Sequence, residues 1–305
     1  MKKLVLVAGM LSVFGGAYAQ ELTSKKGEAI LPEATDWAIS FDASPIFNYF
    51  GNMFHGQNQF NGTPGVNFVN ANQTIVAKKF IDYRSAYRAS LRIGYTSASD
   101  KNAIYQANQV APQFPNLPSM VDDKYRSTNT TIGLGFGKEW RKGRTRLQGF
   151  YGVDGMIWFS NSTTKYTYGN NISSDVSVNP NTSDFGSNLV KDVYGNDARI
   201  LKSKVGSTFG IGVRGFLGAE YFILPKISLG AEYGWGLGLQ FNGKSSVETE
   251  SMGLNSSANL VKGTIKQENP GKSKVGVDTD INNGGIATGL GSGTGTLALR
   301  ATFHF

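Results

Sequence analysis

The chain has 305 residues, 39 of them glycine, no cysteine, and a formal net charge of +8. Without cysteine it forms no disulfide bond and no thiolate metal site, and no stretch after the N-terminal segment has the roughly 18 consecutive apolar residues of a transmembrane helix. A basic chain can bind nucleic acid, but an exported protein has little access to it, so no nucleic-acid partner is expected.

The N-terminal segment has the organisation of a secretory signal. Residues 1–20 read MKKLVLVAGMLSVFGGAYAQ, with two lysines, an apolar run and small residues that end in Ala17-Tyr18-Ala19. This order is typical of a cleaved signal peptide, and the apolar run is too short to span a bilayer. We therefore expect a signal peptide over 1–19, a periplasmic segment over 20–35 and a folded domain over 36–305.

Three segments alternate between apolar and small or polar residues. The clearest is ISLGAEYGWGLGLQF at 227–241, and residues 147–159 and 209–222 repeat the pattern. A period of two predicts a β-strand with one apolar and one polar face. These strands are longer than the usual five or six residues or so and match the roughly ten residues that a tilted membrane strand needs.

The connections between the predicted strands alternate in length. Residues 141–145 and the region of Pro225 predict tight turns, whereas 98–126, 161–204 and 243–293 are long, polar and predicted to be loops, the last one exposed and mobile. Such loops are uncommon in compact soluble domains. We predict an all-β fold, a transmembrane antiparallel up-and-down β-barrel of about eight strands with short periplasmic turns and long extracellular loops. The strands are expected to start near Trp37, Thr74, Ala86, Thr128, Arg146, Thr208, Ile227 and Thr296.

The segment TLALRATFHF at 296–305 predicts the strand that closes this barrel. A barrel must close because lipid cannot satisfy the hydrogen bonds of a free sheet edge. The aromatic residues Phe303 and Phe305 resemble the C-terminal assembly signal of outer-membrane proteins, which implies the barrel-assembly machinery as a partner during biogenesis.

The segments Asp36–Asn52, Asn72–Phe80 and Ala86–Tyr95 resemble the opening of small outer-membrane barrels common in Bacteroidota. This resemblance implies a location in the cell outer membrane, with outer-membrane lipid and lipopolysaccharide as surroundings. It implies no particular substrate.

Charged residues alternate with the apolar face of the predicted strands and are expected inside the barrel. They are Asp42, Lys78, Arg88, Arg92, Glu139, Asp154, Arg214, Glu220, Glu232 and Arg300. One interpretation is a lining that selects permeant ions. We favour a salt-bridge network that fills the lumen, because the interior of an eight-stranded barrel is just wide enough for side chains to fill. In this network the four arginines are expected to neutralise Asp42, Asp154, Glu220 and Glu232.

Basic residues also crowd one predicted turn, namely Lys138, Arg141, Lys142, Arg144 and Arg146. They are interpreted either as a solvated turn or as contacts with anionic lipid headgroups, and the sequence favours neither.

A catalytic site has little support. His55 and His304 are expected at opposite ends of the barrel, and Asp100, Asp122 and Asp123 could join His55 only through loop packing. We expect no enzyme activity, metal or cofactor. The expected function is a structural or interaction protein of the cell envelope, with an envelope protein as partner. A small porin or channel is the alternative, and an outer-membrane enzyme a distant third.

Overall fold

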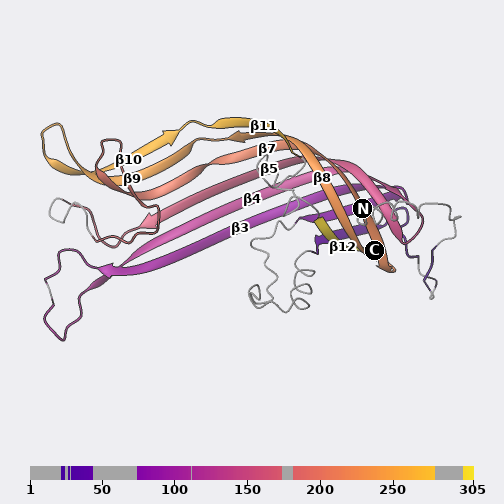
Figure 1. Ribbon diagram of the computed structural model, residues 1–305, viewed down its shortest axis with the longest axis horizontal. Helices are drawn as coiled ribbons and strands as arrows, with labels where there is room; N and C mark the ends of the chain where they lie inside the picture. The colour runs from indigo at the N-terminus through magenta and orange to yellow at the C-terminus, as the bar shows by residue number, and fades with distance from the viewer. Residues whose placement is uncertain are drawn as a thin grey trace, which may run out of the picture.

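A computed structural model describes residues 22–24, 27, 29–43, 74–110, 112–173, 181–278 and 298–305 (Figure 1). The signal peptide predicted over 1–19 lies outside the described residues, as do parts of the segment predicted over 20–35. Within the described part the chain is antiparallel β-structure. A search of that part for an apolar helix of membrane-spanning length found none.

The described residues form one antiparallel sheet of twelve strands. The strands are β1 (Trp37–Asp42), β2 (Ile75–Asp82), β3 (Ser85–Tyr105), β4 (Met120–Lys142), β5 (Leu147–Thr167), β6 (Leu189–Lys191), β7 (Asp197–Leu224), β8 (Ile227–Asn242), β9 (Ser245–Leu254), β10 (Leu260–Asn269), β11 (Lys272–Asp278) and β12 (Ala298–His304).

Eight of these strands form a ring in the order β7-β5-β4-β3-β2-β1-β12-β8, and β8 pairs with β7 again. The strand β12 closes the ring, because Phe303 lies opposite Ile39 of β1 and opposite Ile227 of β8. Trp37 and Phe305 also exchange two backbone hydrogen bonds of 2.8 and 2.9 Å. The all-β antiparallel prediction is confirmed, and the strands of the ring are the eight that the sequence predicts.

Strands of the ring alternate between an exposed and a buried face, as their sequence pattern predicts. In β5 the side chains of Tyr151 and Ile157 are exposed, whereas those of Phe150 and Trp158 are buried. The exposed face is the outside of the ring, and the buried face points into it. Apolar residues therefore cover the outside, while polar and aromatic residues share the inside.

The prediction of three long loops is wrong for much of their length, because strands occupy parts of all three segments. Strand β3 continues to Tyr105, β4 begins at Met120 rather than near Thr128, and β7 begins at Asp197 rather than near Thr208. Strands β9, β10 and β11 occupy most of 243–278, and the remainder of that predicted loop lies outside the described residues. In these segments the strands stay paired through their main chains. Because polar residues predominate on both faces of the sheet there, the sequence shows no alternation between apolar and polar residues. The threonines, serines and tyrosines of these segments suit extended structure.

We call this extension of the sheet the arm. It comprises residues 96–105 of β3, 120–131 of β4, 160–167 of β5 and 197–207 of β7, together with β9 and β10. Strand β9 pairs with β7 at residues 198–204, and β10 pairs with β9 along its length. Figure 1 shows these strands continuing together to the left, away from the ring.

A buried ion pair joins three elements of the arm. Glu250 of β9 accepts a hydrogen bond of 2.7 Å from Arg199 Nε of β7 and lies 2.8 Å from Lys262 Nζ of β10. Burial raises the pKa of Glu250, but the hydrogen bonds and charges of these two cations outweigh it. The pKa therefore lies below its ordinary value of 4.5.

This carboxylate is expected to make the arm sensitive to acid. A group whose pKa is lower in the folded state contributes stability above its unfolded pKa and loses it as the pH falls through the folded value. Replacing Glu250→Gln should therefore speed hydrogen exchange of β9 and β10 amides at pH 7, and the difference from the unmodified protein should shrink as the pH falls below the ordinary value of 4.5. Glu268→Gln, which removes exposed ion pairs with Lys244 and Lys266, is the control. If the difference in exchange rate between the variant and the unmodified protein stays the same from pH 7 to pH 3, the Glu250 carboxylate does not stabilise the arm.

Removal of Phe303–Phe305 is expected to prevent assembly of the ring. The deletion takes away the backbone bonds between Trp37 and Phe305 and leaves Ala38 and Ile39 of β1 and Ile227 of β8 without their partners on β12. The amount of folded, heat-modifiable protein in cell envelopes should fall strongly. A double variant, Phe303→Leu with Phe305→Leu, keeps the backbone pairing and isolates the contribution of the aromatic rings. Normal levels of the truncated protein would show that the ring closes without these residues.

Candidate functional site

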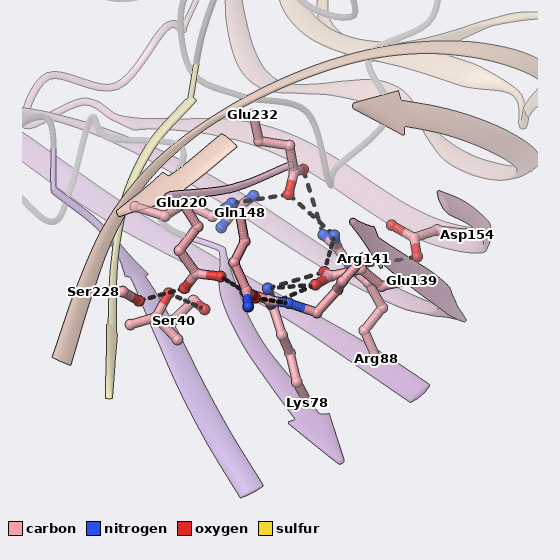
Figure 2. A network of polar contacts seen from close by, with 12 residues as sticks. Ser40, Lys78, Arg88, Glu139, Arg141, Gln148, Asp154, Glu220, Ser228 and Glu232 are labelled. Atoms are coloured by element: carbon pink, nitrogen blue, oxygen red, sulfur yellow. Dashed lines mark hydrogen bonds and ion pairs between the residues drawn. The ribbon is translucent and has the colours of Figure 1, made fainter. Parts of the chain in front are cut away.

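The inside of the ring holds a network of charged side chains that are almost inaccessible to solvent (Figure 2). Each is at most 7% exposed. They are Lys78 of β2, Arg88 of β3, Glu139 and Arg141 of β4, Asp154 of β5, Arg214 and Glu220 of β7, Glu232 of β8 and Arg300 of β12. Residues far apart in the sequence therefore meet in one enclosed volume.

Arg88 lies at the centre of this network (Figure 2). Its Nη1 lies 3.3 Å from Glu139 Oε2 and 3.0 Å from Glu232 Oε2, and its Nε lies 3.5 Å from Asp154 Oδ1. The ring centroid of Phe216 is 3.9 Å from the Arg88 guanidinium carbon. A planar guanidinium can donate several hydrogen bonds in its plane while its face stacks on an aromatic ring, and Arg88 uses both capacities.

Glu139 connects Arg88 to a second group of charges. Its carboxylate lies 2.9 Å from Lys78 Nζ and 2.9 Å from Arg141 Nη1. Arg141 also forms an ion pair with Glu220, and its Nε donates a 2.9 Å hydrogen bond to Gln148. The side chain of Arg141 therefore bridges β4, β5 and β7.

Glu232 is the third carboxylate shared between cations. Arg214 Nη1 lies 2.8 Å from Glu232 and 3.6 Å from Asp154, and Arg300 Nε lies 3.5 Å from Glu232. With Arg88, this places three arginines from three strands around one carboxylate.

A histidine completes the network near the turns of the ring. His304 Nε2 lies 3.4 Å from Glu220, which also accepts a hydrogen bond from Ser228. The imidazole packs between Phe80 and Phe222, at centroid distances of 5.6 and 5.0 Å. Aromatic packing thus covers the charges at this end.

Large side chains fill the space that inward-facing glycines leave on neighbouring strands. A Cβ atom added at any of four glycines would lie 2.0 to 2.4 Å from such a side chain. The pairs are Gly152 with Phe216, Gly210 with Trp158, Gly218 with Phe150, and Gly234 with Arg214. The volume beside these four glycines is therefore occupied.

The charges inside the ring are close to balanced. Five basic residues face four carboxylates among the described side chains, with His304 in addition, and each carboxylate contacts two or more basic groups. An isolated buried charge costs several kcal/mol. At least one cation beside each carboxylate, and two or three beside Glu139, Asp154 and Glu232, offset that cost.

Two of the residues expected in the network are absent from its described ion pairs. Arg92 is half-buried and forms no ion pair with another described residue. Asp42 lies opposite Arg300 in the register of β1 and β12, but its side chain is outside the described part of the structure. Glu220 pairs with Arg141 rather than with one of the four arginines expected to neutralise it.

Arg141 is the residue that sequence reasoning missed. The sequence predicts a solvated or lipid-contacting turn at this residue, but Arg141 is buried and paired with two carboxylates. The signal was present, because Arg141 follows Glu139 by two residues and therefore shares its inward face. The predicted turn at 141–145 begins two residues too early, because β4 ends at Lys142, and this hid the parity.

The acidic residues considered for catalysis do not form a catalytic group among the described residues. Asp123 is fully buried and accepts backbone hydrogen bonds of 2.8 Å from Gly169 and Ser183, so it shapes the chain between β5 and β7. Asp100 and Asp122 are exposed, and His55 lies outside the described residues. In the same part of the chain, no three acidic or histidine side chains are grouped to hold a metal ion.

Comparison with models of protein families, with curated proteins and with solved structures found no match. The ring and its charge network are therefore the main basis for a functional assignment.

Replacing Glu232→Ala is expected to lower the free energy of unfolding by about 3–5 kcal/mol, because three arginines lose their shared buried carboxylate. Chemical denaturation of the purified protein, followed by tryptophan fluorescence, measures this change. Leu237→Ala on the same strand is the control, since Leu237 is exposed on the outside of the ring, and it should cost much less. An equal loss for both variants would mean that the network does not stabilise the ring.

Proposed function

We propose that the ring is a transmembrane β-barrel of the bacterial outer membrane with a filled lumen, and that the protein is a structural or interaction component of the cell envelope. The observation that carries this proposal is the distribution of polarity. Charged side chains are buried inside the ring, and apolar side chains are exposed outside it. A water-soluble protein has the opposite arrangement.

The outer surface carries continuous apolar rows. Ile132, Phe159, Phe209 and Phe241 lie directly opposite one another on β4, β5, β7 and β8, and all are exposed. Leu134, Ile157, Ile211 and Leu239 form the next row in the same way. Soluble monomers rarely expose apolar patches of this extent, whereas a membrane barrel presents such a band to lipid.

Aromatic and basic side chains border this band at the turn end of the ring. Lys79 Nζ lies 5.1 Å from the ring centroid of Trp37, and Lys138 Nζ lies 5.7 Å from that of Trp140. Arg144 donates a 3.0 Å hydrogen bond to the hydroxyl of Tyr83. Aromatic girdles with nearby cations are typical of membrane interfaces. For Lys138 and Arg144 this supports contact with anionic headgroups over a purely solvated turn.

The arm supports a role in interaction. At the tip of the connection between β3 and β4, Val110, Phe114 and Leu117 are each about nine-tenths exposed or more. Exposed apolar side chains at a loop tip are suited to contact with a partner protein. The predicted signal peptide and the resemblance to Bacteroidota barrels support a location in the outer membrane.

Two measurements test the proposal. The protein should remain with membranes after an alkaline carbonate wash, and release by that wash would rule out a membrane barrel. In planar bilayers the unmodified protein should pass almost no steady current, because the network and its aromatic neighbours fill the ring. The double variant Arg88→Ala with Glu232→Ala removes both members of one pair and should raise conductance. Large steady currents through the unmodified protein would establish a channel instead.

A co-purification experiment tests the interaction role. Gentle solubilisation followed by cross-linking should capture an envelope protein with the unmodified chain, and Phe114→Ser with Leu117→Ser should weaken that capture. The control Ile223→Ser, at the other end of the sheet, should not. If the loop-tip variant captures as much partner protein as the unmodified chain, the contact lies elsewhere on the protein.

A further inference from the structure

One face of the arm carries adjacent basic side chains on four neighbouring strands. Lys101 of β3 lies opposite Lys124 of β4. Arg126 of β4 lies opposite Lys165 of β5, which lies opposite Lys202 of β7. Directly opposite residues of an antiparallel pair share a face, with Cβ atoms about 4.5–5.5 Å apart. We call these five residues the basic ladder, and all of them are exposed.

The basic ladder has no acidic partner among the described residues. None of its five members forms an ion pair there, and neither does Lys204 of the arm, whereas Lys191, Lys244, Lys262 and Lys266 in the arm or beside it do. Asp100 borders the ladder and Glu248 lies opposite Lys202, but neither is in ion-pair contact with it. Like charges placed directly opposite one another destabilise a sheet, so the ladder has a cost that an anionic ligand would remove.

A hollow in the surface is lined by every ladder residue except Lys202, and also by Asp100. It has a volume of about 350 Å³, and its lining includes Ser99, Lys101, Lys124, Arg126, Lys165 and Thr167. Arg126 Nε donates a 3.1 Å hydrogen bond to Ser97 Oγ, which holds the guanidinium at the rim. Cations with hydroxyl groups between them provide the donors that a phosphate or a carboxylate requires.

The position of the ladder narrows the choice of ligand. Ile132 is the β4 member of the apolar row that lies nearest to the arm. Arg126 lies six residues from it along β4, and Thr128 and Thr130 lie between them on the same face. Six residues span about 20 Å along a strand, or about 14 Å along the membrane normal for a strand tilted by about 45°. Headgroups extend only about 5–8 Å beyond the hydrocarbon core. The ladder would thus lie above ordinary phospholipid headgroups, at the level of a longer anionic saccharide.

We propose that the basic ladder binds the phosphate groups of an anionic glycolipid of the lipopolysaccharide type in the outer leaflet. The inference rests on the proposed function, because the membrane sets the height of the ladder. The phosphates neutralise Arg126, Lys165 and Lys202, and the serine and threonine hydroxyls orient the saccharide.

The test measures binding of purified rough-type lipopolysaccharide to the full-length protein in non-ionic detergent. The ladder variant is Arg126→Gln, Lys165→Gln and Lys202→Gln. The control variant Lys244→Gln, Lys266→Gln and Lys272→Gln removes the same number of exposed charges from the neighbouring strands and turns. The ladder variant should bind roughly tenfold more weakly or worse, and the control within about twofold of the unmodified protein. Chemically dephosphorylated lipopolysaccharide should bind the unmodified protein as weakly as intact lipopolysaccharide binds the ladder variant.

Measuring the Tm of each variant with and without lipopolysaccharide separates a loss of binding from a loss of folding. Without glycolipid the ladder variant should be as stable as the unmodified protein or more so, because it lacks the like-charge repulsion. Intact lipopolysaccharide should raise the Tm of the unmodified protein and of the control, but not that of the ladder variant.

Equal affinity of both variants for lipopolysaccharide, or equal binding of phosphatidylglycerol and lipopolysaccharide at the ladder, would overturn the inference. These outcomes leave the proposed function standing, whereas release of the unmodified protein by the carbonate wash would refute the proposed function itself.

Discussion

Each described carboxylate inside the ring contacts two or more basic groups from different strands, and much of the remaining architecture depends on this sharing. Glu139 joins cations of β2, β3 and β4, and Glu232 joins those of β3, β7 and β12. Because side chains alternate with a period of two, a slip of one residue in any pairing would turn these charges outward and leave partners unpaired. The ion pairs therefore help to specify the register of strands that are remote in the sequence.

The narrow interior of the ring explains the composition of its inward face. A ring of eight strands is narrow, and several of its large inward side chains lie beside a glycine of an adjacent strand. Glycine on one strand and Phe150, Trp158, Phe216 or Arg214 on the next is the arrangement that the structure adopts. The inward glycines thus leave room for aromatic and guanidinium groups, and these groups pack together with the charged network inside the ring.

In the proposed function, one continuous set of strands serves two environments. Within the ring, apolar residues face outward and the polar network is enclosed. In the arm, strands β4, β5 and β7 continue with polar side chains on both faces and gain new neighbours, β9 and β10. The ring is suited to anchoring in lipid, and the arm presents polar, basic and locally apolar surfaces beyond it. This division is why we assign interaction to the arm and a structural role to the ring.

The sequence by itself determined the strands of the ring and the face on which each residue lies. Alternation is a local property, so residues 227–241 could be assigned to β8 with Glu232 facing inward without any knowledge of its neighbours. The same parity placed Arg88, Asp154 and Arg214 inside, and it would have placed Arg141 there had the turn been set two residues later.

Only the tertiary structure decided which charges meet and how far the sheet extends. The pairing of Glu220 with Arg141, and the isolation of Arg92, depend on the relative register of β3, β4 and β7 around the ring. Local periodicity carries no information about that register. The arm was missed for a related reason, since strands that are polar on both faces are held by main-chain hydrogen bonds to their neighbours and leave no hydropathy signal in the sequence.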